Sequence, residues 1–212
     1  MRNTFDMDNL FFRFTSRIAD IFILNLIFVI TCIPVFTIGA AVTALISTSL
    51  KMSENKEGYI IRQYWKAFRQ NFKQATGIHL IMTAIGALLG FDIYFWFSHK
   101  TGMSAVMLIG AVAMMFVYLL VLLYAYVQQA LFENTVKANL KNGFLTALKN
   151  FPFTVLMMVC LAVVTAAVYF LNAAKVFMLL FGFGLYGYLT AFIYRRIYRE
   201  YIEDEPDEEV EE

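Results

Sequence analysis

Long apolar runs separated by short basic segments constrain this chain more than any other feature of its sequence. A membrane-spanning helix needs about 20 consecutive, mainly apolar residues, and the runs that meet this length cover residues 18–50, 75–98, 103–128, 153–171 and 176–194. Backbone polar groups inside lipid must be paired within the protein, so each run is expected to be helical. The sequence therefore predicts an all-α, polytopic membrane helix bundle with about five transmembrane helices.

Composition and charge support this division of the chain. Of the 212 residues, 60% are hydrophobic and 16% are charged, whereas soluble domains average about 45–50% and about 25%. We expect an N-terminal interfacial lead (1–17), a single transmembrane domain (18–200) and an acidic, disordered tail (201–212). Eight of the 16 acidic residues lie in Glu203–Glu212, so the remainder carries 17 basic against eight acidic groups, a net charge of +9. A body this basic suits a bilayer with anionic headgroups.

The first apolar run is too long for one straight crossing. As a helix, residues 18–50 would extend about 50 Å, against a hydrocarbon core of about 30 Å. Pro34 lies in its middle and is expected to kink the helix, and Asn25 and Thr31 are placed to pair backbone groups that the kink frees. Thr37 and Gly39 begin a stretch of small residues that favours close helix packing. We favour one long kinked span, and a re-entrant hairpin of two half-helices is the alternative.

A basic and aromatic segment, GYIIRQYWKAFRQNF, follows at residues 58–72. At 3.6 residues per turn its aromatic and cationic side chains fall on different faces, as in a helix lying at a membrane surface. The predicted surface helix includes Arg62, Trp65, Lys66, Phe68, Arg69, Phe72 and Lys73.

Residues 136–151 show a weaker version of the same pattern, and each version leads directly into an apolar run. We therefore expect two cytoplasmic amphipathic interfacial helices and a parallel internal repeat of span, surface helix and span. Independent convergence of two basic linkers is the alternative.

Lysine and arginine counts orient the chain. Residues 51–74 contain six, residues 129–150 contain three, and three arginines follow the last run, whereas the two short turns hold one each. Cytoplasmic segments carry the excess of such residues, so the basic loops and the C-terminus are expected to be cytoplasmic. Five crossings then place the N-terminus outside, which conflicts with Arg2, Arg13 and Arg17. A hairpin in the first run would place the N-terminus inside and remove the conflict.

The sequence shows no catalytic pattern. His79 and His99 have no Cys, Asp or Glu at ligand spacing, and nucleophile motifs and phosphate-binding glycine loops are absent. Gly86 and Gly90 form a GxxxG pair of the type that packs membrane helices. We expect no enzymatic activity, no cofactor, no metal and no nucleic-acid partner.

Two segments resemble a known family. PxxTxGAAxTAL at residues 34–45 and KAFRQNFKQA at residues 66–75 are similar to the YesL family, a domain-of-unknown-function family of bacterial integral membrane proteins, and the resemblance extends over the whole length. It implies a bacterial plasma-membrane location and an association with sugar-uptake ABC transporters, and it supplies no catalytic residues. We therefore expect a non-enzymatic accessory or scaffold protein linked to carbohydrate uptake, with ABC transporter membrane subunits as partners. A small transporter or channel is the alternative.

Overall fold

The structure, a computed structural model, describes residues 5–54, 58–99 and 102–199. Helices make up 91% of these residues, and no strand occurs among them. The elements are α1 (Phe5–Thr31), the 3₁₀ turn η1 (Val35–Thr37), α2 (Ile38–Ser53), α3 (Ile60–Ser98), α4 (Ser104–Leu131), α5 (Val136–Lys149), α6 (Phe151–Phe170), α7 (Asn172–Phe177), the π-helical segment η2 (Met178–Gly182) and α8 (Phe183–Ile197). Five segments of the described chain are long and apolar enough to cross a membrane. These findings confirm the all-α class and indicate a multi-pass membrane protein. The predicted acidic tail lies outside the described residues.

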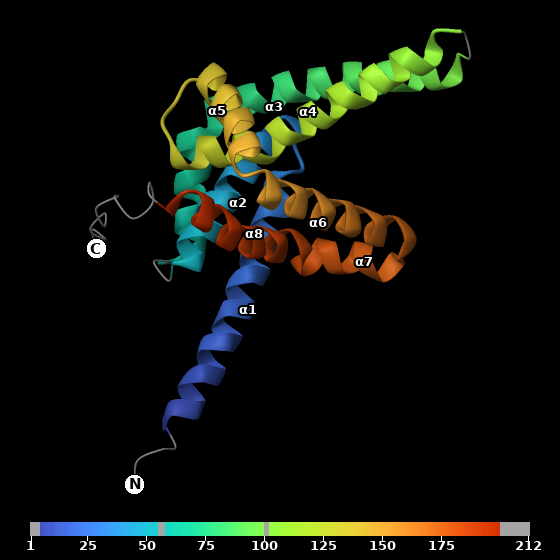
Figure 1. The fold of residues 1–212 in the computed structure, drawn as a ribbon. Helices are drawn as coiled ribbons and strands as arrows, with labels where there is room; N and C mark the ends of the chain where they lie inside the picture. The colour runs from blue at the N-terminus through green and yellow to red at the C-terminus, as the bar shows by residue number, and fades with distance from the viewer. Residues whose placement is uncertain (1–4, 55–57, 100–101, 200–212) are drawn as a thin grey trace.

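Two helical hairpins project in the same general direction from a common base (Figure 1). The second half of α3 packs against α4 in one of them, and in the other α6 runs outward while α7, η2 and α8 return. Their arms carry large exposed apolar side chains, among them Leu88, Phe97, Ile109, Val163 and Phe170. Apolar surface of this extent is rare on soluble monomers and is what a lipid-facing helix requires.

Residues 18–50 form two helices rather than one kinked span. Pro34 lies in the break between α1 and α2, where its missing N–H and its restriction of the preceding residue end a helix. Arg17, in α1, donates a hydrogen bond of 3.1 Å to the carbonyl of Met52, near the end of α2. At the opposite end, the Thr37 hydroxyl donates to a carbonyl in the last turn of α1. The two helices are therefore antiparallel neighbours, which is the geometry of the hairpin alternative.

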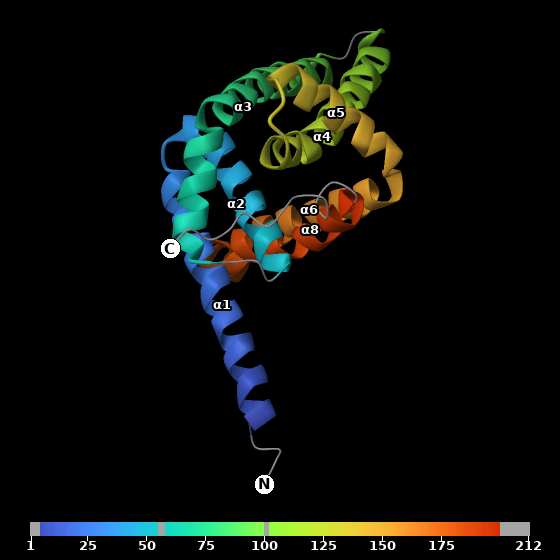
Figure 2. The same cartoon turned by 90° about the vertical axis from the view of Figure 1, so that its left-hand side faces the viewer.

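The predicted surface helix and the second predicted span are one continuous helix, α3, of 39 residues. At 1.5 Å per residue it is about 58 Å long, roughly twice the thickness of a hydrocarbon core. Its first half lies across the base, and its second half forms a hairpin arm (Figure 2 looks onto the base). In the second copy of the predicted repeat, the surface helix is α5 and the span that follows it is α6. Here the two helices are separate, because Asn150 lies between them and Pro152 lies in the first turn of α6. The two copies differ at this junction, and the internal repeat stays a prediction.

Two apolar clusters hold the base together. The first joins α1, α2 and the start of α3 through residues that include Leu24, Ala40, Ala44 and Tyr64. The second joins α2, α3, α4, α6 and α8 through residues that include Ile78, Tyr124, Met157 and Tyr194. Gly39 lets α2 approach α3 closely, because a Cβ at this position would meet the carbonyl oxygen of Ala75. Small residues at such crossings are typical of membrane helix packing.

Candidate functional site

Asn25 connects α1 to the interrupted helix at the other end of the chain. Its side chain is fully buried. The Nδ2 atom donates to the Leu179 carbonyl at 2.8 Å, and Oδ1 accepts from the Gly184 N–H at 2.9 Å. Leu179 belongs to the π-helical segment η2, where the wider turn disturbs the usual backbone pairing. Asn25 therefore pairs backbone groups, as expected, but those groups belong to η2 and α8 and not to the break at Pro34.

Threonine hydroxyls pair the carbonyls at the Pro34 break instead. Thr37 Oγ1 donates to the carbonyls of Thr31 and Pro34, at 2.5 and 2.6 Å. The Thr31 hydroxyl lies 2.6 Å from the hydroxyl of the buried Tyr64, which links the end of α1 to α3. Thr31 Oγ1 also donates to the Ile27 and Phe28 carbonyls at 2.9 and 3.0 Å. The role that the sequence assigned to Asn25 and Thr31 is therefore performed by Thr31 and Thr37.

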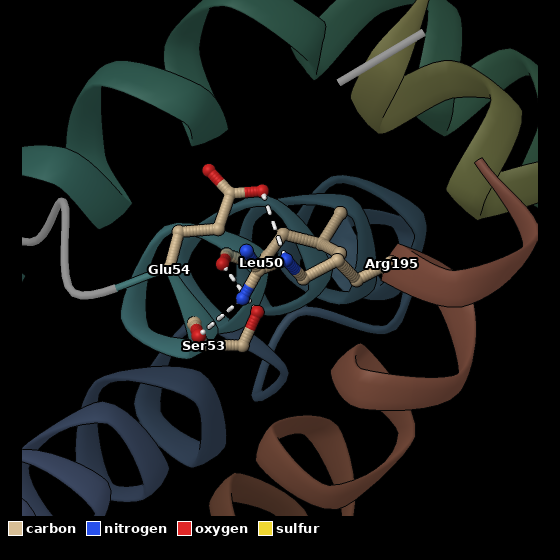
Figure 3. Close-up of polar contacts among 4 residues, drawn as sticks. All are labelled: Leu50, Ser53, Glu54 and Arg195. Carbon is tan, nitrogen blue, oxygen red and sulfur yellow. Dashed lines mark hydrogen bonds and ion pairs between the residues drawn. The ribbon is translucent and has the colours of Figure 1, made fainter. Parts of the chain in front are cut away.

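Two arginines from distant parts of the chain hold the C-terminal end of α2. Arg17 donates to the carbonyl of Met52, and Arg195 Nη1 donates to the carbonyl of Ser53, each at 3.1 Å. The Nε atom of Arg195 also lies 4.0 Å from Glu54 Oε1, as Figure 3 shows. Carbonyls at a helix C-terminus lack helical partners and carry partial negative charge, so guanidinium groups pair well with them. The contacts bring α1, the end of α2 and the end of α8 to one side of the molecule.

A network of uncharged amides joins α3, α4 and α5 at the base. Gln129 Nε2 donates to Asn71 Oδ1 at 2.8 Å and to Gln74 Oε1 at 3.0 Å. Its Oε1 accepts from Asn139 Nδ2 at 2.8 Å. Gln129 and Asn139 are buried, and their hydrogen bonds join α3, α4 and α5, although Asn139 Oδ1 accepts no hydrogen bond from the described residues.

The preceding residue of α4 extends these connections to the end of α8. Gln128 Nε2 donates to the Tyr198 hydroxyl at 2.9 Å and to the Thr146 hydroxyl at 3.2 Å. One turn of α4 therefore contacts α3 through Gln129, and α5 and α8 through Gln128. The positions of the first half of α3 and the end of α8 are fixed relative to each other by this turn.

The exposed face of the first half of α3 carries an open groove, which we call the basic groove. It has a volume of about 570 Å³ and is lined by Arg62, Trp65, Lys66, Arg69 and Gln70. The three cations are exposed, and Trp65 is 39% exposed. With cations and an indole ring on one outward face, the groove is suited to anionic groups.

The aromatic residues of the predicted surface helix divide between two environments. Tyr64 and Phe68 are buried in the cluster with α1 and α2, and Phe72 is half-buried, with its ring 5.5 Å from that of Phe68. Trp65 stays at the surface, and Lys73 is exposed one turn beyond the groove. Much of the apolar face that we assigned to lipid is thus in contact with protein.

The two glycines of the GxxxG pair have different surroundings. A Cβ at Gly86 would lie 2.7 Å from the Tyr118 hydroxyl of α4, so this glycine permits the approach of α3 and α4. A Cβ at Gly90 would have no heavy atom within 4 Å.

The described residues contain no group of three His, Cys, Asp or Glu side chains that could hold a metal ion. His79 Nδ1 lies 3.1 Å from the Tyr126 hydroxyl, and His99 stacks on Phe95. Among the described residues, the surface best suited to bind a ligand is the basic groove, where cations and the Trp65 ring can contact an anionic group.

Residues 21–93 match a family model. Its description is "Protein of unknown function, DUF624". That family is the YesL-type domain. The DUF624 match begins within α1, contains the Pro34 break and the basic groove, and ends within α3. No curated protein and no solved structure matches the chain.

The amide network and the arginine contacts at the end of α2 were not predicted from the sequence. The adjacent amides Gln128 and Gln129, at the end of an otherwise apolar run, were the available signal for the network. Polar side chains that close a long apolar helix commonly need a partner inside the protein. The residues that pair with these two amides lie 10 to 70 positions away in the sequence. Such partners can be identified only once the fold is known.

Proposed function

We propose that this chain is a non-enzymatic accessory or scaffold protein of the bacterial plasma membrane, and that it binds membrane subunits of a carbohydrate-uptake ABC transporter. The observation that carries the proposal is the basic groove. It faces outward from a helix whose opposite side is packed against α1 and α2. The link to carbohydrate uptake is what the YesL resemblance of residues 34–45 and 66–75 implies, and both segments lie within the matched residues 21–93.

The basic groove has the residue composition and the rigid support of a surface that binds a protein partner. The groove combines two arginines and a tryptophan, residue types that are enriched in protein interfaces and their energetic hot spots. The neighbouring amide network holds Asn71, just beyond the groove, against α4. A partner would therefore bind a surface that is already ordered, which lowers the entropic cost of association.

We further propose that this surface lies on the cytoplasmic side, at the level of anionic headgroups. Residues 51–74 hold six of the 17 lysines and arginines, three more lie at positions 195–199, and Arg17 and Arg195 contact the same helix end. An excess of lysine and arginine marks cytoplasmic segments. The apolar hairpin arms then extend into the bilayer.

Co-purification tests this function. The chain is purified from its native membranes in mild detergent, and the co-eluting transporter membrane subunits are quantified by mass spectrometry. Arg62→Gln/Lys66→Gln/Arg69→Gln should lower their recovery by roughly tenfold, since interface charges contribute to both encounter and residence. The matched control, Lys137→Gln/Lys141→Gln/Lys149→Gln, removes the same charge from exposed positions of α5 and should change recovery less than twofold. Absence of transporter subunits from the unaltered preparation, or equal loss in both variants, would contradict the proposal.

One observation favours the transporter alternative. The α1–α2 break and the π-helical segment η2 are two helix interruptions, and Asn25 joins α1 directly to η2. Interrupted helices place polar groups at the binding sites of many transporters. Sugar flux into proteoliposomes that contain this chain alone would favour transport, and flux that appears only with the ABC subunits would favour the accessory role.

A further inference from the structure

We infer that the acidic C-terminal segment, residues 203–212, docks on the basic groove of α3 and competes there with the partner. The inference rests on the proposed function for the identity of that partner. Docking of the tail itself is a property of this chain alone.

Charge complementarity is the first argument. The segment holds eight acidic residues in ten positions, and the rest of the chain carries a net charge of +9. Arg62, Lys66 and Arg69 are exposed in the groove, and Lys73 extends the row by one turn of α3. Opposite charges attract over about 10 Å at moderate salt, so this concentrated negative segment is drawn to a concentrated positive surface.

Reach is the second argument. Tyr198, at the end of α8, is bonded to Gln128, and the adjacent Gln129 is bonded to Asn71, two positions beyond Arg69 on α3. The end of α8 and the first half of α3 lie on the same side of the molecule, away from the hairpin turns (Figure 1). From Arg62 to Lys73 the row of cations extends about 16 Å along the helix. A chain of 13 residues after Arg199 can extend about 45 Å, almost three times the length of that row.

Tethering is the third argument. A ligand that is joined covalently to its binding surface by a few residues is present at an effective concentration in the millimolar range. Exposed ion pairs are individually weak, yet several of them acting at millimolar concentration are enough to occupy an open groove. A partner must then displace the segment, which makes the segment an internal competitor.

Quenching of Trp65 measures the docking directly. Trp96→Phe leaves Trp65 as the sole tryptophan, and Cys32→Ser with Cys160→Ser removes both native thiols. A nitroxide is then attached to Glu208→Cys, and the full chain is studied in uncharged detergent micelles. We expect Trp65 fluorescence to fall at least twofold at low salt and to recover at high salt, because salt screens the attraction.

Charge variants identify the surface. Quenching should be lost when Arg62, Lys66 and Arg69 are changed to Gln, and it should be retained when Lys137, Lys141 and Lys149 are changed to Gln. Unquenched Trp65 at low salt, or equal quenching in the two variants, would overturn the inference. In the unaltered chain, zero-length carboxyl–amine cross-linking should join the acidic segment to Lys66 or Lys73 and not to the α5 lysines, and the reverse pattern would also overturn it.

Partner recovery separates this inference from the proposed function. Truncation after Ile202 should raise recovery of the transporter subunits several-fold relative to the full chain. If neither form recovers any subunit, the proposed function fails while quenching still reports on docking. If Trp65 is quenched but truncation after Ile202 does not raise recovery of the transporter subunits, the proposed competition between the acidic segment and the partner is wrong.

Discussion

At the scale of single residues, polar side chains inside the apolar helices serve to join elements. Asn25 pairs with the backbone of η2 and α8, Thr37 closes the break at Pro34, and Gln129 joins three helices. The sequence assigned Asn25, Pro34 and Thr37 to helix kinking and packing, but the structure places Asn25 at η2 and α8 and Thr37 at the Pro34 break. The sequence assigned the wrong partner to Asn25 because helical periodicity reports neighbours within a few turns, whereas Leu179 lies 154 positions away.

Replacement of Asn25 tests this account at the residue scale. Asn25→Leu should destabilise the protein by about 2 kcal/mol, because it leaves a carbonyl and an N–H unpaired in an apolar environment. The melting temperature in detergent should fall by about 5 °C. Thr165→Val on α6 is the control, since the Thr165 hydroxyl is exposed and bonds only to Leu161 of its own helix, and it should shift melting by about 1 °C or less. Similar shifts for both variants would contradict the role of Asn25.

At the scale of elements, α3 shows that a change from basic to apolar sequence does not predict where a helix ends. The change from basic to apolar sequence near residue 74 indicated where the bilayer begins, and we placed a helix boundary there. The helix in fact continues to Ser98, because residues 60–98 contain no proline that would end it. The α5–α6 boundary was predictable by the same criterion, since Pro152 follows it directly.

The approach of α2 to α3 gives a prediction at this scale. Gly39→Ala should destabilise the protein by about 1–3 kcal/mol, because the added methyl would meet the backbone of α3 at Ala75 and force the helices apart. Gly90→Ala adds the same methyl to open space and should be neutral or slightly stabilising, as expected for alanine in a helix. Chemical denaturation in detergent compares the two variants. Equal destabilisation would show that the α2–α3 crossing is looser than the structure has it.

At the scale of the whole molecule, four of the predicted apolar runs became the arms of two hairpins, and the first became the α1–α2 pair. Run length and hydropathy predicted the arms, since lipid imposes a helix length. The antiparallel arrangement of α1 and α2 was left open between two alternatives, because a proline shows where a helix ends and not the direction that the chain takes afterwards. The contact of Arg17 with Met52 decides that direction.

The central claim is that the start of α1, the basic groove, α5 and the C-terminus share one face of the membrane, opposite the hairpin turns. Sided thiol labelling tests it most directly. Ser16→Cys, Lys149→Cys and Gly102→Cys are exposed positions, each introduced into a chain without native cysteines in sealed membrane vesicles of known orientation. We expect a membrane-impermeant maleimide to label Ser16→Cys and Lys149→Cys from the cytoplasmic side only, and Gly102→Cys from the outer side only. Labelling of Ser16→Cys from the same side as Gly102→Cys would contradict the α1–α2 hairpin and the shared cytoplasmic face.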